Sequence, residues 1–207
     1  MDQNSAQCLR SYQRIAPFYD LIDLPFEYGR YRSIRPLLFA GLGGRLLDAG
    51  VGTGRNMAFY PPGAEVTGVD LSPAMLDRAA KRRSGPTTRV RLMQMDLSRL
   101  QFADNSFDAA VASFVFCTMP PQSRRAALRE LSRVLKPGGR LRLLEYAPAK
   151  SAFRRKVTRA WQPWVTWAFG AKLDQDIEPE LSQVDLRPTS SRYLTSNIKL
   201  IEAGPIP

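Results

Sequence analysis

The feature that most constrains the fold is a run of seven residues, Asp48-Ala49-Gly50-Val51-Gly52-Thr53-Gly54, which ends the buried strand predicted over 45–48. Glycines at alternate positions let the backbone turn sharply and approach a ligand without Cβ atoms in the way. Further along the chain, short apolar runs alternate with helical stretches, which is typical of βαβ units. Open α/β sheets bind ligands where their strands end. The sequence therefore predicts an α/β fold whose ligand loop directly follows the first strand.

Apolar periodicity and turn residues place the other elements. Strands are expected at 45–48, 65–70, 90–95, 107–114, 140–146, 191–195 and 198–203. Helices are expected to begin at 55, to span 72–83 and 122–135, and to form a short element at 178–184. Ser72 followed by Pro73 supplies a helix N-cap and a first-turn residue that needs no amide donor. Lys136-Pro137-Gly138-Gly139 is expected to close the helix over 122–135.

Composition excludes several kinds of chemistry. The chain has no histidine, which removes histidine general bases, Ser-His-Asp catalysis and most zinc sites. Its two cysteines, Cys8 and Cys117, are far apart, so no metal is expected. The N-terminus lacks the pattern of a signal peptide and no apolar stretch approaches the length of a transmembrane helix, so a cytoplasmic protein is expected. A net charge of +11 predicts attraction to a polyanion, either nucleic acid or an anionic membrane face.

The glycine run distinguishes between two classes of nucleotide-like ligand. The dinucleotide fingerprint G-x-G-x-x-G requires a glycine at position 55, where this chain has Arg55. An acid at the head of the run, Asp48, suits a ligand with an amino group better than one with a pyrophosphate. Asp70 ends the second strand 22 residues later, near the spacing expected for a carboxylate that binds ribose hydroxyls. These residues favour S-adenosylmethionine over a nicotinamide cofactor.

Four motifs in order then resemble a known family. They are the runs 14–20 (RIAPFYD), 46–54 (LLDAGVGTG), 69–76 (VDLSPAML) and 135–139 (LKPGG). Residues from about 13 to 146 resemble class I S-adenosylmethionine-dependent methyltransferases, in the branch of ubiquinone/menaquinone C-methyltransferases and bacterial phospholipid N-methyltransferases. The resemblance implies a Rossmann-like, doubly wound, seven-stranded sheet, mostly parallel with the last strand antiparallel, and an N-terminal helical lid.

The resemblance also implies roles for individual residues. The methionine end of the cofactor is expected to be held by Asp48, Gly50, Gly52 and Gly54, with Ser113 beside it. Asp70 is expected to bind the ribose, and the adenine is expected to lie against Leu71, Met75, Asp96 and Leu97. Two alternatives stay open: Leu71 and Met75 pack in the core, and Asp96 caps the turn before Ser98.

A single domain of four parts follows from these assignments. Residues 1–40 are expected to form a helical lid that contacts a membrane, interrupted by Pro17, Pro25 and Pro36, and residues 41–150 the cofactor-binding core. Residues 151–175 form a basic segment that holds all three tryptophans of the chain, and residues 176–207 a C-terminal helix and strands. Tryptophans beside arginines in the acid-free stretch 151–172 are typical of an interfacial membrane anchor.

Transfer of an activated methyl group needs positioning and water exclusion more than strong acid–base chemistry. The residues expected to accept the acceptor's proton or to orient it are Tyr19, Tyr146, Glu27 and Glu145. Ordinary packing of the tyrosines is the alternative. Arg192 and Tyr193 are expected to bind a substrate phosphate.

The basic segments indicate the substrate class. The predicted enzyme methylates a membrane lipid on the inner face of the membrane, which it contacts through 1–35 and 151–172, with phosphatidylethanolamine as the leading acceptor. C-methylation of a quinone precursor is the first alternative, and methylation of RNA or of a small molecule is another. A partner protein that keeps the fold without catalysis is a third. No separate RNA-binding module is seen, so no nucleic-acid partner is expected.

Overall fold

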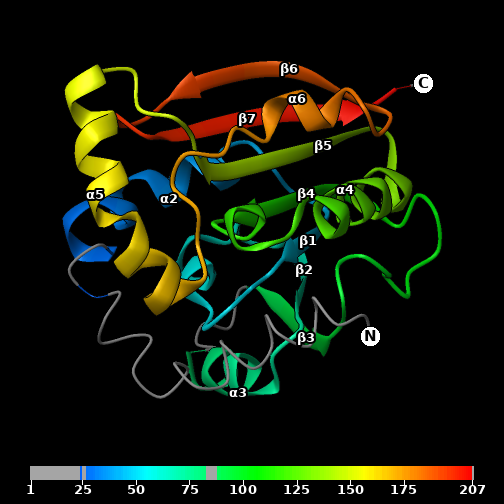
Figure 1. Cartoon of the computed structure of the whole chain (residues 1–207). Coiled ribbons are helices and arrows are strands. Elements are labelled where there is room, and N and C mark those ends of the chain that lie inside the picture. The colour runs from blue at the N-terminus through cyan, green and yellow to red at the C-terminus, as the bar shows by residue number, and fades with distance from the viewer. Residues whose placement is uncertain (1–23, 25–26, 83–87, 207) are drawn as a thin grey trace.

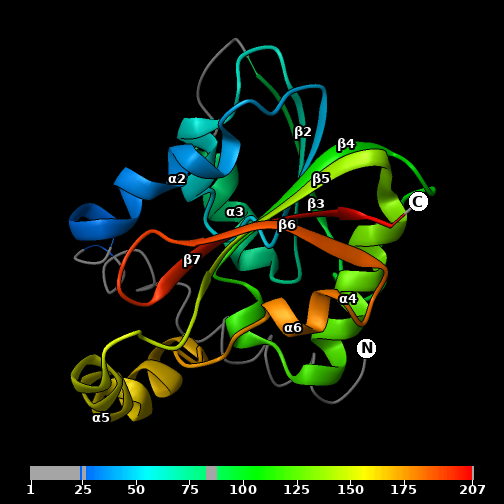
Figure 2. The same ribbon diagram turned by 90° about the horizontal axis from the view of Figure 1, so that it is seen from above.

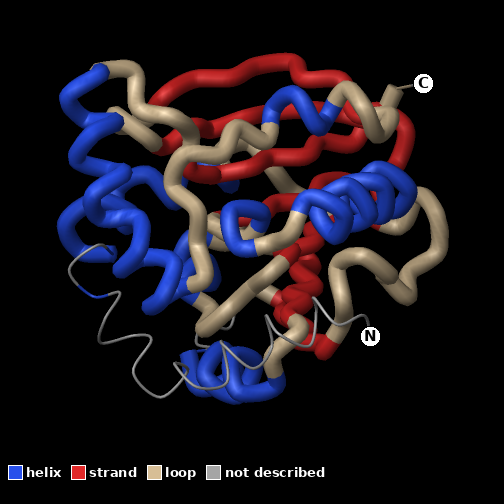
Figure 3. Tube along the Cα trace, in the orientation of Figure 1, coloured by secondary structure: helices blue, strands red, loops and turns tan. Residues whose placement is uncertain are grey.

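A seven-stranded sheet with helices on both faces forms the centre of the molecule (Figures 1 and 3). The computed structural model describes residues 24, 27–82 and 88–206. The strands are β1 (Arg45–Ala49), β2 (Glu65–Asp70), β3 (Arg89–Gln94), β4 (Phe107–Ser113), β5 (Leu135–Tyr146), β6 (Leu186–Tyr193) and β7 (Ile198–Pro205). The helical elements are η1 (Glu27–Tyr31), α2 (Arg32–Phe39), η2 (Arg55–Phe59), α3 (Pro73–Arg82), η3 (Phe116–Thr118), α4 (Pro121–Val134), α5 (Ala152–Phe169) and α6 (Glu178–Leu181).

The strand order is β3-β2-β1-β4-β5-β7-β6, so the order reverses at β1. There β1 pairs in parallel with β2 on one side and with β4 on the other. The last strand of the chain, β7, is antiparallel to both of its neighbours, β5 and β6. This is the predicted Rossmann-like sheet. Its switch point, where such sheets bind ligands, lies at the end of β1.

Two hydrophobic layers cover the faces of the sheet. Successive side chains of a strand point to opposite faces, and in β1 the fully buried Leu46 and Leu47 belong to different layers. The Leu47 layer includes residues of α4 and α6, whereas the Leu46 layer includes residues of α2. Figure 2 shows α4 and α6 on one side of the sheet and α2 on the other. Since both faces of β1 are covered, only its ends are open to a ligand.

All seven predicted strands are present, but β5 and β6 each begin five residues earlier than expected. β5 starts at Leu135, so the Lys136–Gly139 run lies inside the strand instead of closing α4. The register between β4 and β5 shifts at this point, and Gly138 has a φ of +76°, so the glycines accommodate an irregularity in a continuing strand. β6 starts at Leu186; it lies at the edge of the sheet and its exposed polar residues give no apolar alternation to detect.

The break expected at Pro36 is wrong, because Pro36 lies inside α2. Ile34, Leu38 and Phe39 of this helix are buried, and their packing outweighs the lost amide donor of the proline. The breaks expected at Pro17 and Pro25 fall outside the described residues.

α5 follows β5 and stands at the edge of the sheet where β5 ends (Figure 1). It packs through Val165 onto a small cluster with Cys117, Ala171 and Leu173. Two aromatic residues from the ends of β4 and β5, Phe114 and Tyr146, border this cluster. In the described part of the chain, no helix is both long enough and apolar enough to cross a membrane.

Candidate cofactor and acceptor site

The glycine loop after β1 turns back over the end of β2. Gly50 and Val51 donate their amides to the carbonyl of Val69, at 2.8 and 2.9 Å. A Cβ added at Gly50 would lie 2.3 Å from a methyl group of Val115, so only glycine fits this crossing. Gly52 has a φ of +54°, and a Cβ added there would meet nothing within 4 Å. The middle of the loop therefore offers bare backbone on an open side, as a ligand cradle requires. Gly54 ends the loop and also has a positive φ, +82°.

Asp70, the last residue of β2, connects the loop to the start of α3. One carboxylate oxygen accepts a hydrogen bond from the Gly52 amide at 2.9 Å, and the other accepts from the Ser72 amide at 2.9 Å. Burial raises the pKa of Asp70, while these two backbone hydrogen bonds lower it. The carboxylate is thus held rigidly beside the open glycine, which fits the predicted contact with ribose hydroxyls.

Asp48 lies at the end of β1 with no exposed surface. Its carboxylate accepts from the Tyr60 hydroxyl at 2.6 Å and from the Asn56 amide at 3.1 and 3.2 Å. Burial raises the pKa of Asp48 to about 6, against the opposing effects of these hydrogen bonds and of the nearby Arg35. Sequence reasoning missed Asn56 and Tyr60; their positions on the expected helix after the loop were the one signal available.

A buried ion pair joins the N-terminal elements to this carboxylate. Arg35 of α2 bonds Glu27 of η1 through Nε, at 3.0 and 3.1 Å, and through Nη2, at 2.9 Å. The Nη1 group of Arg35 donates to Asn56 at 2.7 Å and to Ser113 at 3.2 Å. Glu27, predicted as a proton acceptor, is therefore engaged by Arg35. Ser113 lies beside Asn56, 3.1 Å from its Nδ2, and its contact with the methionine end of the cofactor stays a prediction.

The residues predicted to surround the adenine lie at the ends of β2 and β3. Met75 and Leu97 are buried, and Leu71 is half-buried. Asp96 accepts from the amide of Ser98 at 2.9 Å and from its hydroxyl at 2.6 Å, which is the turn-capping role left open above. A contact of these residues with adenine stays a prediction.

An aromatic cluster lies on the far side of Ser113. The hydroxyls of Tyr31 and Tyr146 are 2.5 Å apart, and the ring of Phe114 lies 4.6 Å from that of Tyr31 and 5.1 Å from that of Tyr146. Phe114 has a φ of +57°, which is rare for a bulky residue and occurs preferentially at functional sites. Tyr146 was among the predicted acceptor residues, Tyr31 was missed, and Tyr19 lies outside the described residues.

Glu145 holds the backbone that follows Phe114 in this cluster. Its carboxylate accepts the backbone amides of Val115 at 2.7 Å, Phe116 at 2.8 Å and Cys117 at 3.3 Å. Burial raises the pKa of Glu145 to about 7. Both of its oxygens are thus directed at the segment after β4, so its geometry is that of a residue that positions Phe114, and its predicted part in proton transfer gains no support.

Arg192 and Tyr193, the predicted phosphate ligands, are consecutive residues of the edge strand β6, and consecutive strand residues point to opposite faces. The Tyr193 hydroxyl donates to the carbonyl of Pro148 at 2.8 Å, whereas Arg192 is exposed. The structure therefore does not bring the two side chains to one anion, because the strand geometry separates them.

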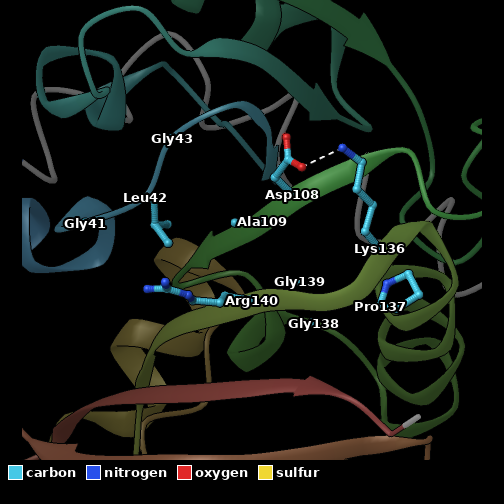
Figure 4. A pocket seen from close by; sticks show the side chains of 10 residues that line it. All are labelled: Gly41, Leu42, Gly43, Asp108, Ala109, Lys136, Pro137, Gly138, Gly139 and Arg140. Atoms are coloured by element: carbon cyan, nitrogen blue, oxygen red, sulfur yellow. Dashed lines mark hydrogen bonds and ion pairs between the residues drawn. The ribbon is translucent and has the colours of Figure 1, made fainter.

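A pocket of about 260 Å³ lies at the opposite ends of the strands, away from the glycine loop (Figure 4). Its lining comes from the residues before β1 and from the starts of β4 and β5, including Asp108 and Lys136, which form an ion pair. The glycine loop is at the other ends of these strands. This pocket is therefore not the cofactor site.

The fold and the loop define a class of protein. Residues 47–143 match a family described as methyltransferase domain. Among solved structures, a geranyl diphosphate C-methyltransferase of Streptomyces coelicolor, in complex with S-adenosyl-L-homocysteine, superposes with a TM-score of 0.66 and 19% identity, over 86% of this chain and 82% of that one. The cofactor is S-adenosylmethionine. The carboxylates of Asp48 and Asp70 can accept hydrogen bonds from its amino and hydroxyl groups, and the open Gly52 and Ser113 lie beside them.

Relatives of known activity narrow the class. A ubiquinone/menaquinone biosynthesis C-methyltransferase of Syntrophotalea carbinolica is 41% identical to this chain, and the match covers 66% of this chain and 60% of that enzyme. A demethylmenaquinone methyltransferase of Thermus thermophilus is 38% identical, over 69% of this chain and 67% of that enzyme. A phosphatidylethanolamine N-methyltransferase of Cereibacter sphaeroides is 37% identical, over 66% of this chain and 66% of that enzyme. The chain belongs to the class I S-adenosylmethionine-dependent methyltransferases, in the branch that contains these enzymes.

Cofactor affinity is expected to fall as the pH drops below about 6. The ammonium group of the cofactor favours the ionised form of its predicted partner Asp48, whose pKa in the free protein is about 6. Protonation of this carboxyl removes the attraction, so the dissociation constant should rise by up to about tenfold per pH unit below that value. Calorimetric titrations with S-adenosylmethionine at pH 5, 6 and 7 measure this. The Asp48→Asn variant should bind more weakly with a flatter profile; an unchanged wild-type affinity from pH 7 to pH 5 would refute the assignment.

Proposed function

We propose that this chain transfers a methyl group from S-adenosylmethionine to a lipid held in an anionic membrane surface, with phosphatidylethanolamine as the first acceptor. The enzyme then binds peripherally to the inner face of the membrane. The observation that carries the proposal is the outer surface of α5, where large apolar side chains lie exposed beside basic ones.

The exposed apolar residues of α5 form one stripe. Phe153 is 74% exposed, Val157 43%, Trp161 58% and Trp164 40%. Their spacings of four, four and three residues place them on one face of the helix. A helix with such a face, basic neighbours and no acidic residue has the pattern of an interfacial membrane helix. The exposed basic residues of the same helix are Arg154, Arg155, Lys156 and Arg159.

The buried C-terminal part of α5 supports a lipid acceptor as well. Val165 packs on the cluster that Phe114 and Tyr146 border, at the end of the sheet that holds Ser113. A helix that lies on the membrane with its stripe would therefore bring these aromatic residues near the lipid surface. This arrangement allows a head group to reach the cofactor while its acyl chains stay in the membrane.

The aromatic cluster favours an amine acceptor. Each transfer to phosphatidylethanolamine leaves a more highly methylated cationic nitrogen, and aromatic faces attract such cations. The ring of Phe114, the residue after Ser113, lies 4.6 Å from that of Tyr31 and 5.1 Å from that of Tyr146, so three aromatic rings gather at this point. The 37% identity with the Cereibacter phosphatidylethanolamine N-methyltransferase supports the same acceptor.

C-methylation of a quinone precursor is the second candidate, and a specific observation favours it. The relatives with 41% and 38% identity are a ubiquinone/menaquinone C-methyltransferase and a demethylmenaquinone methyltransferase. A prenylated quinol is also an aromatic, membrane-held molecule, and the same rings and the same helix would suit it.

The test is methyl transfer from labelled S-adenosylmethionine by the purified protein. Four acceptors are compared: anionic vesicles with phosphatidylethanolamine, the same vesicles without it, vesicles that carry a demethylmenaquinol, and tRNA. Label in phosphatidylethanolamine derivatives supports the first candidate, and label only in the quinol supports the second. Label in tRNA, or no label while the cofactor still binds, overturns the lipid proposal in favour of an RNA enzyme or of a non-catalytic partner protein.

A further inference from the structure

Arg35 was not predicted as a site residue, yet its guanidinium group contacts side chains of the cofactor site. Its side chain is 6% exposed, and it donates hydrogen bonds to Asn56 and Ser113. Asn56 in turn donates to Asp48, the residue predicted to meet the cofactor's amino group. The guanidinium group therefore lies at the methionine end of the site, next to the carboxylate that the amino group needs.

S-adenosylmethionine carries a carboxylate on the same carbon as its amino group. In a buried site that carboxylate needs a charged or strongly donating partner, since an unpaired ion in low dielectric is costly. The roles predicted for the site supply carboxylates for the amino group and the ribose. They supply no cation for the carboxylate.

Among the described residues, three arginines are buried: Arg35, Arg124 and Arg142. Arg142 pairs with Glu202 and with the carbonyls at the end of α2, and Arg124 pairs with Glu180 and Gln175. Neither bonds a side chain of the cofactor site. Arg82, in the last turn of α3, donates to the carbonyl and hydroxyl of Thr53 in the glycine loop, where Ala79 of the same helix packs against Gly54. These hydrogen bonds therefore go to the loop itself and to neither Asn56 nor Ser113.

The hydrogen bonds of Arg35 leave capacity for a further acceptor. A guanidinium has five N–H donors. Nε and one hydrogen of Nη2 are directed to Glu27, and Nη1 bonds Asn56 and Ser113. One hydrogen of Nη2 has no partner among the described residues. Glu27, bonded through both oxygens, fixes the plane of the group.

We propose that Arg35 binds the carboxylate of S-adenosylmethionine, with Glu27 as the residue that positions its guanidinium. The amino acid end of the cofactor would then lie between opposite charges, its ammonium toward Asp48 and its carboxylate toward Arg35. This assignment concerns the cofactor alone and does not depend on which acceptor the enzyme methylates.

Decarboxylated S-adenosylmethionine provides the test, because it keeps the sulfonium and the amino group and lacks only the carboxylate. Dissociation constants for both ligands are measured by calorimetry, without an acceptor, on the wild-type protein, Arg35→Gln and Arg35→Lys. The wild type should prefer the carboxylated ligand by about 30-fold, the effect expected of a charged hydrogen-bonded pair. Arg35→Gln should lower this preference to about threefold or less, and Arg35→Lys, which keeps the charge without the fork, should be intermediate.

Arg82→Gln is the matched control, since it also removes a cation that bonds the site. It should weaken both ligands alike and keep the preference. A wild type without preference overturns the proposal, and so does an Arg35→Gln protein that loses affinity for both ligands equally, since the arginine would then only hold the fold. If Arg35→Gln does not fold, the wild-type and Arg35→Lys preferences still decide. An unchanged preference with a raised KM for the lipid acceptor would assign Arg35 to the acceptor's phosphate and also overturn the proposal.

Discussion

Replacing Phe153, Trp161 and Trp164 together with serine is expected to weaken binding to anionic vesicles about 100-fold. These side chains lie on the exposed stripe of α5, where insertion into the headgroup region buries their apolar surface. Full burial of a large apolar side chain contributes about 1.5–3 kcal/mol, so partial insertion of three should contribute about 3 kcal/mol, which corresponds to that factor. Cosedimentation with vesicles that contain phosphatidylglycerol measures the change.

The affinity of this variant for S-adenosylmethionine should stay within about twofold of the wild type, because none of the three residues contacts the glycine loop. Ile206→Ser serves as the matched control: Ile206 is 51% exposed, but follows β7 at the end of the sheet away from α5. It should leave vesicle binding intact. If the triple variant binds vesicles like the wild type, α5 is not the membrane contact and the proposal must rest on another surface.

Asp70→Ala is expected to weaken cofactor binding about 30-fold. The substitution removes the predicted ligand of the ribose hydroxyls and, at the same time, the acceptor of the Gly52 and Ser72 amides. Loss of charged hydrogen bonds in a buried setting costs about 2 kcal/mol, which corresponds to that factor. Calorimetric titration with S-adenosylmethionine measures it directly.

Asp108→Ala provides the comparison for Asp70→Ala. Asp108 also accepts a backbone amide, that of Arg45 at 2.7 Å, but at the opposite edge of the sheet. Its loss should lower thermal stability without changing cofactor affinity. Affinity within about threefold of the wild type in Asp70→Ala would contradict the ribose assignment. The cofactor affinity of Asp70→Asn, which keeps an acceptor for one amide, should lie between that of the wild type and that of Asp70→Ala.

The central sheet was predictable because its signals are local. The apolar strands 45–48 and 65–70 and the glycines between them lie within 26 residues, and each strand is buried on both faces. The first half of the edge strand β6 gave no such signal, since the residues that follow the buried Leu186 are mostly polar and exposed. The early start of β5 was missed because proline and two glycines usually end an element, whereas here they form an irregular part of the strand.

The residues of the candidate site also fall into two groups, those predictable from local sequence and those that meet only through tertiary contacts. Asp48, Gly52 and Asp70 were predicted from spacing along the chain, and the structure brings the last two within 2.9 Å of each other. Asn56, Tyr60, Tyr31 and Arg35 were missed, because each acts through a side chain that meets a distant partner. Residues 35 and 113, for example, are 78 positions apart and meet only when α2 packs on the sheet beside β4.

The sequence by itself determined the fold class, the cofactor and the loop that cradles it, because a turn of glycines between two buried strands depends on local backbone geometry. Only the tertiary structure decided what the isolated charges do. Folding directed Glu27 to Arg35 and Glu145 to three backbone amides, since burial leaves a carboxylate no alternative to a nearby donor. It also decided which part of α5 is exposed: Val165, near the end of the helix, is buried in the cluster beside the sheet, whereas Trp161, one turn earlier, is exposed.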